Sequence, residues 1–138
     1  MRSFAMLLAA TLALAGCGPS PSEPAADSAR EADMNIDPGL REPVRSAIDD
    51  LAERIGVAAD AIEVAEAAYV TWPNGALGCP EPGMAYTQAL VPGYRIRLEH
   101  DAGVHHYHGA EGRPPFHCPA DRVAPPAAES PGRMNPRA

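Results

Sequence analysis

The sequence has 138 residues and a formal net charge of -7 at pH 7, which leaves room for one compact domain. An acidic chain lacks the basic surface that nucleic acids bind, so we expect no nucleic-acid partner. All of its basic residues are Arg, and the absence of Lys excludes Schiff-base chemistry on a lysine.

The first 17 residues are typical of an exported bacterial protein. The apolar run 4–15 is too short to span a bilayer, but it suits the core of a signal peptide. It ends at Leu14-Ala15-Gly16-Cys17, which resembles the bacterial lipobox and implies cleavage before Cys17 and acylation of Cys17, for example with palmitate. The acyl chains would anchor the protein to the membrane. By resemblance to sorted lipoproteins, the presence of Gly18 rather than Asp after Cys17 implies the outer membrane. The alternative is an ordinary signal peptide followed by an unmodified Cys17.

The rest of the chain divides by composition. Residues 18–37 are rich in Pro, Ser, Ala and acidic residues, which predicts a disordered tether. Residues 38–118 contain the apolar patterns of a folded domain. Residues 119–138 are again rich in Pro, Ala and Arg, which predicts a disordered tail.

One helix is expected between Glu42 and Gly56. Pro43 suits a first helical turn, and Gly56 suits the residue that follows a helix. Apolar residues recur at helical spacing on one face, namely Val44, Ala47, Ile48, Leu51 and Ile55.

Four strands are expected after the helix. They are residues 62–72, 84–91, 94–100 and 104–108, separated by Pro- and Gly-rich turns such as Pro92-Gly93. The alanines and glutamates of the first segment also suit a helix, but Ile62, Val64, Ala68, Val70 and Trp72 alternate as in a strand. Short turns imply antiparallel neighbours. The sequence therefore predicts an α+β fold with one helix packed on a four-stranded antiparallel meander sheet.

Cys79 and Cys118 remain once Cys17 is assigned to lipid. An even pair in an exported protein predicts a disulfide. A disulfide that closes a loop of about 40 residues stabilises a fold by roughly 4 kcal/mol, if its effect is attributed to the reduced entropy of the unfolded chain.

Metal binding is the alternative interpretation of the same region. His106 and His108 share a strand face and, with His117, lie near Cys118 in the sequence. Imidazole and thiolate are ligands for zinc and copper. The sequence has no Cys-x-x-Cys or His-x-x-x-His spacing, however, and histidine-rich strand ends more often form only a polar surface.

Several motifs together resemble a family of small uncharacterised bacterial envelope proteins. The motifs are Trp72-Pro-Asn-Gly-Ala-Leu-Gly-Cys79-Pro, Tyr86-Thr-Gln88, Pro92-Gly-Tyr94 and Tyr107-His108. The resemblance covers about residues 51–118 and implies a fold and a location in the envelope. The chain departs from the family pattern at Asn74, where Asp is expected, and at His105, where Tyr is expected.

No catalytic motif is present in the sequence, so we expect neither an enzyme nor a cofactor. An unpaired Cys79 beside a histidine would keep a cysteine nucleophile open. We expect instead a binding module for an envelope protein. Its expected recognition surface consists of amphipathic residues, namely Trp72, Leu77, Tyr86, Gln88, Tyr94 and Tyr107. Core packing is the competing role for the same residues.

Overall fold

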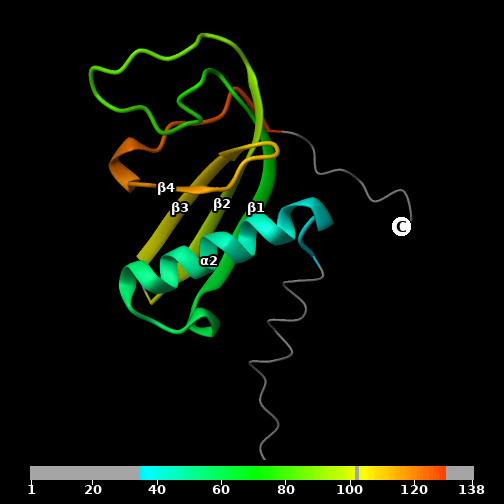
Figure 1. Ribbon diagram of the computed structural model, residues 1–138, viewed down its shortest axis with the longest axis vertical. Coiled ribbons are helices and arrows are strands. Elements are labelled where there is room, and N and C mark those ends of the chain that lie inside the picture. The colour runs from blue at the N-terminus through cyan, green and yellow to red at the C-terminus, as the bar shows by residue number, and fades with distance from the viewer. Residues whose placement is uncertain (1–34, 102, 130–138) are drawn as a thin grey trace, which may run out of the picture.

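The computed structural model describes residues 35–101 and 103–129, which form one helix and one sheet (Figure 1). The helix α2 (Arg41–Ile55) lies across an antiparallel sheet of five strands in the order β4-β3-β2-β1-β5. The strands are β1 (Glu63–Trp72), β2 (Val91–His100), β3 (Gly103–Ala110), β4 (Phe116–Cys118) and β5 (Ala128–Glu129). The predicted α+β class is confirmed, but the sheet has five strands rather than four. Within the described ranges, every helix is too short or too polar to cross a membrane.

The helix α2 matches its prediction closely. It follows a short 3-10 turn, η1 (Pro38–Leu40), and is followed by Gly56, whose φ of 70° lies in the left-handed region. The Gly56 N–H donates to the carbonyl of Ala52 at 2.9 Å, which closes the last turn. The helical spacing of the apolar residues gives α2 one buried face, and that face covers the sheet.

The main core lies between α2 and the sheet. Alternate residues of β2 and β3 point toward the helix, because successive side chains of a strand point to opposite faces. The fully buried members of this core are Leu40, Val44, Ala47, Leu51, Ile62, Tyr94, Ile96, Leu98 and Tyr107.

A bulge in β1 changes which side chains face the helix. Val64 pairs with Leu98, but the next pair joins Glu66 to Arg97, so Ala65 is an extra residue in β1. Val64 packs against the main core, whereas Trp72 does not belong to it. The predicted alternation from Ile62 to Trp72 on one face is therefore wrong, since the bulge moves the later residues to the other face.

The sheet face turned away from α2, here called the far face, carries a second and smaller core. Trp72 is fully buried there, and its ring lies 4.5 Å from that of His108 between ring centroids. Gly93 lies beneath the indole: a Cβ on Gly93 would come within 2.6 Å of Trp72 Nε1. Pro92-Gly93 is thus part of β2 rather than the predicted turn, because the glycine is needed for the close approach of Trp72.

The predicted strand at residues 84–91 is wrong. β1 and β2 are joined by residues 73–90, here called the long loop, which contain no strand. It projects from one end of the sheet, at the top of Figure 1. Nearly all of residues 80–90 are exposed, so the apolar residues in this segment lack a neighbouring layer on which a strand would pack.

The chain does not leave the fold at Cys118. Residues 119–129, here called the strap, run from β4 at one edge of the sheet to β5 at the other. The Ala124 N–H donates to the carbonyl of Gly78, and the Ala127 N–H donates to that of Thr71, each at 2.8 Å. The prediction of a disordered tail from residue 119 is therefore wrong for the strap. Residues 130–138, like the predicted signal peptide, Cys17 and most of the tether, lie outside the described residues.

Candidate functional site

Three of the six predicted recognition residues are buried. Trp72, Tyr94 and Tyr107 have exposed fractions of 0%, 2% and 1%. Leu77 and Tyr86 are half-buried and Gln88 is exposed, all three in the long loop. The proposed surface of six residues is therefore corrected: the three buried aromatic residues pack the two faces of the sheet, and only the long-loop residues lie near the surface.

The two buried tyrosines have structural partners. The Tyr94 hydroxyl donates to the carbonyl of Arg113 at 2.6 Å, and the Tyr107 hydroxyl donates to Asp50 Oδ2 at 2.7 Å. Burial raises the pKa of Tyr94 to about 12, and burial together with the Asp50 hydrogen bond raises the pKa of Tyr107. Both phenols stay protonated at neutral pH and act as hydrogen-bond donors within the fold.

The three candidate metal-binding histidines are divided by the sheet. His106 and His108 lie on the far face, whereas His117 pairs with Tyr107 across β3 and β4 and lies on the helix face. The His117 ring centroid is 5.3 Å from that of Tyr107. In the described part of the chain, no three His, Cys, Asp or Glu side chains are grouped so as to hold a metal. The alternative metal interpretation is therefore wrong for this set.

The predicted disulfide joins Cys79 to Cys118. Their Cα atoms are 5.8 Å apart, and both residues are buried on the far face, with exposed fractions of 5% and 0%. The bond fastens the long loop to β4. It also occupies Cys79, so the hypothesis of a cysteine nucleophile at this position is wrong.

His108, in β3, is hydrogen-bonded to the backbone of the long loop. Its Nδ1 lies 2.8 Å from the carbonyl oxygen of Leu77, and its side chain is 2% exposed. A carbonyl oxygen only accepts, so Nδ1 carries the proton of the neutral ring. Burial lowers the pKa of His108 to about 4, although the hydrogen bond to Leu77 opposes part of this shift. His108 is therefore a neutral structural donor at physiological pH.

Internal hydrogen bonds brace the rest of the long loop. Asn74 Oδ1 accepts from the Ala76 N–H at 2.9 Å, and the Gly75 N–H donates to the carbonyl of Thr87 at 2.9 Å. Further out, the Tyr86 hydroxyl accepts from the Glu81 N–H at 2.9 Å. Arg122 of the strap pairs with Glu81, also at 2.9 Å. These four contacts hold the long loop in place, although nearly all of residues 80–90 are exposed.

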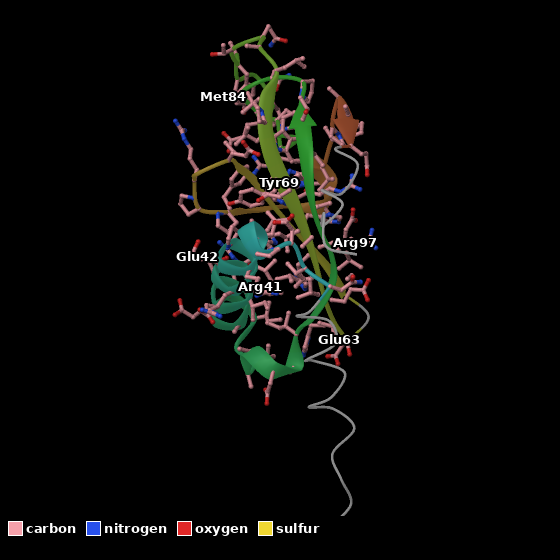
Figure 2. The ribbon with its side chains drawn as sticks, turned by 90° about the vertical axis from the view of Figure 1, so that its right-hand side faces the viewer. Arg41, Glu42, Glu63, Tyr69, Met84 and Arg97 are labelled. Atoms are coloured by element: carbon pink, nitrogen blue, oxygen red, sulfur yellow. A yellow bond between two sulfur atoms is a disulfide. The ribbon has the colours of Figure 1, made fainter. Side chains whose placement is uncertain are left out.

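The long loop presents two large apolar side chains to solvent. Met84 and Leu90 are 58% and 67% exposed, the largest values among the exposed large apolar residues of the described chain. Figure 2 shows Met84 at one end of the molecule and Glu63, the first residue of β1, at the other. The sequence prediction missed both residues because it placed them in a strand; the Pro- and Gly-rich flanks were the available signal for a loop.

A charged cluster lies on the far face beside the strap. Arg95 Nε and Nη2 both donate to Glu66 Oε1, at 2.9 and 2.6 Å, and Arg95 Nη1 lies 2.7 Å from Glu129 Oε1. Arg97 Nη1 lies 3.5 Å from Glu66 Oε2. These residues and the strap border a groove of about 220 Å³. The sequence analysis assigned Glu129 to a disordered tail and therefore did not anticipate its ion pair with Arg95.

One protein family matches the sequence, over residues 44–118, and its description is Domain of unknown function (DUF8738). Comparison with curated proteins found no match. Comparison with solved structures also found none.

Proposed function

This chain belongs to the DUF8738 family, and we propose that it is a binding module of the bacterial cell envelope, anchored through lipid on Cys17. In this proposal the long loop is the contact surface. The partner is another envelope protein that offers an apolar patch to Met84 and Leu90.

The observation that carries this proposal is a long loop that is restrained by a disulfide and hydrogen bonds and exposes two large apolar side chains. Connections of more than about 15 residues without regular structure are uncommon in compact domains and are usually functional or disordered. Here the disulfide, the His108–Leu77 hydrogen bond and the Gly75–Thr87 hydrogen bond restrain the loop. A restrained loop loses less conformational entropy on binding, which favours affinity.

The location in the envelope is supported by the disulfide and by the N-terminal sequence. Disulfides persist in exported proteins, whereas cytosolic thiols are kept reduced. The run that ends at Cys17 resembles a lipobox, and several acyl chains on one residue give stable attachment to a membrane.

Site-specific crosslinking tests the contact surface. A photo-crosslinking residue at Ala85, which is exposed between Met84 and Tyr86, is expected to capture one envelope protein in intact cells. The double variant Met84→Asp, Leu90→Asp is expected to weaken binding of that partner at least about tenfold, because each buried apolar side chain contributes about 1.5–3 kcal/mol.

Val104→Asp is the matched control. Val104 is 44% exposed and lies next to the turn between β2 and β3, at the end of the sheet away from the long loop. The long loop is not the contact surface if Val104→Asp weakens partner binding as much as the double variant does. The same conclusion follows if the double variant still captures the partner as the wild type does.

Acylation is tested separately. Cys17→Ala is expected to abolish incorporation of labelled palmitate and to release the protein into the soluble periplasmic fraction. Retention of Cys17→Ala in the membrane fraction with unchanged labelling would reject the anchor and leave the loop proposal intact.

A further inference from the structure

The described residues cover the outer edge of β1 over only part of its length. Within the described chain, β5 pairs with β1 at two positions, Val70 with Glu129 and Thr71 with Ala128. The Ala127 N–H adds one hydrogen bond to the carbonyl of Thr71, at 2.8 Å. No described strand pairs with this edge at residues 63–68. An uncovered strand edge presents backbone donors and acceptors that a further strand can pair with.

The strap reaches this edge with a carboxylate directed at Arg95. Glu66 holds the Arg95 guanidinium through Nε and Nη2, so Nη1 is left for Glu129. The side chains of Arg95 and Glu66 are each 26% exposed, whereas that of Glu129 is 61% exposed. The arginine is thus positioned by the sheet itself, and the strap supplies an exchangeable partner.

The remaining contacts of the strap with the far face are sparse. Val123 is 36% exposed, and Ala127 and Ala128 are exposed as well. The groove of about 220 Å³ between strap and sheet is lined by Trp72 and Arg95, and by Pro125 and Pro126 from the strap. The strap therefore buries little apolar surface at this edge, where its specific contacts are the short ladder and the ion pair. Its other specific contacts, from Ala124 to Gly78 and from Arg122 to Glu81, are made with the long loop.

We propose that the β1 edge at residues 70–72, together with Arg95, is a strand-addition site for an extended peptide that carries a side-chain carboxylate. The strap is the resident occupant of this site. A partner segment with small residues and a glutamate or aspartate replaces β5, pairs antiparallel with β1 and gives its carboxylate to Arg95. Backbone pairing supplies the affinity, and the carboxylate supplies the selectivity. A longer segment continues the ladder along residues 63–68, which the strap leaves uncovered.

Peptide binding to the full chain tests this site. The probe is a fluorescent peptide with the sequence Ala-Pro-Pro-Ala-Ala-Glu of residues 124–129, blocked at both ends so that its only carboxylate is the glutamate side chain. In the wild-type chain the strap competes within the same molecule, which raises the apparent Kd. Two variants weaken the strap: Ala127→Pro removes the N–H that bonds to Thr71, and Glu129→Gln removes the charge.

We expect fluorescence anisotropy to show binding to both variants, at least about tenfold tighter than to the wild type. A probe with Gln in place of Glu is expected to bind about tenfold more weakly, since hydrogen bonds to charged groups contribute about that factor. In a further probe, Pro replaces the Ala that corresponds to Ala127. This probe lacks the N–H that bonds to the carbonyl of Thr71 and is expected not to bind. Arg95→Gln, introduced into the Glu129→Gln chain, is expected to remove the preference for Glu over Gln.

Equal binding of the Glu and Gln probes would overturn the proposal, as would equal binding to wild type and variants, or no binding to either variant. Because Glu129 is largely exposed, Glu129→Gln leaves the core untouched and carries the test even if Ala127→Pro fails to fold. The residues of this site, 70–72 and Arg95, do not belong to the long loop. The Met84→Asp, Leu90→Asp chain is expected to bind the probe as its parent does, so failure here leaves the long-loop proposal standing.

Discussion

The two faces of the sheet are stabilised in different ways. The helix face is covered by α2 and filled with apolar side chains from α2, β2 and β3. The far face has no α-helix over it in the described structure. Its small core consists of Trp72, His108 and the Cys79–Cys118 disulfide, with the strap across it. A domain of this size gains one compact core from its helix, and a covalent bond stabilises the face that lacks such a cover.

The two faces also differ in their roles: the helix face stabilises the fold, whereas the far face carries the proposed recognition surfaces. The helix face leaves little apolar surface exposed, whereas the far face supports both the long loop and the strap. Loops that carry function need a rigid base, and here the disulfide and His108 provide it. Perturbing each face in turn measures how far the two depend on each other.

Removing the disulfide is the largest expected perturbation of the far face. Cys79→Ala with Cys118→Ala is expected to lower the free energy of unfolding by about 4 kcal/mol, because the denatured chain regains the freedom of a loop of 39 residues. Urea denaturation of the exported protein measures it. A loss below about 1 kcal/mol would mean that the far-face core holds without its covalent bond.

Truncating Leu51 is the matched perturbation of the helix face. Leu51 is 0% exposed within the main core, and Leu51→Ala is expected to lower the free energy of unfolding by about 3 kcal/mol through lost contacts and a residual cavity. Val70→Ala, a smaller truncation of the equally buried far face, serves as the comparison. A larger loss at Val70 than at Leu51 would reverse the assignment of the main core.

His108 makes the far face sensitive to acid. Its pKa of about 4 in the folded protein lies below the unfolded value of 6.5, so the unfolded chain binds more protons between these values. The stability contribution is fully present above pH 6.5 and falls as the pH decreases toward 4, by about 2 kcal/mol between pH 7 and pH 5. His108→Gln is expected to flatten this part of the profile, measured by urea denaturation at each pH. A profile unchanged by the substitution would show that His108 is not buried in its neutral form.

Tyr107→Phe is expected to give the smallest effect. It removes the hydrogen bond to Asp50 and leaves the ring in the core, so the free energy of unfolding falls by about 1 kcal/mol. Asp50 keeps its partner Arg54, which limits the loss. Thermal unfolding monitored by circular dichroism is sufficient, and a loss above about 3 kcal/mol would indicate that Asp50 depends on Tyr107 more than on Arg54.

Much of the helix face was predictable from local patterns. The helical spacing from Val44 to Leu51 and the glycine at position 56 specify α2, and the alternation of Tyr94, Ile96 and Leu98 specifies the inner side of β2. The far face was less predictable, because the bulge at Ala65 reverses the orientation of the later residues of β1. Pro92-Gly93 has the composition of a turn, yet it lies in a strand to accommodate an indole that is distant in the sequence.

The sequence by itself determined the α+β class, the position of the helix and the pairing of Cys79 with Cys118. These follow from short-range periodicity and from the small number of cysteines. Only the tertiary structure decided that the long loop is not a strand, that the candidate histidines lie on opposite faces, and that the strap returns to β1 and places Glu129 on Arg95. Those features depend on contacts between residues far apart in the chain, whose energies are not encoded in any local pattern.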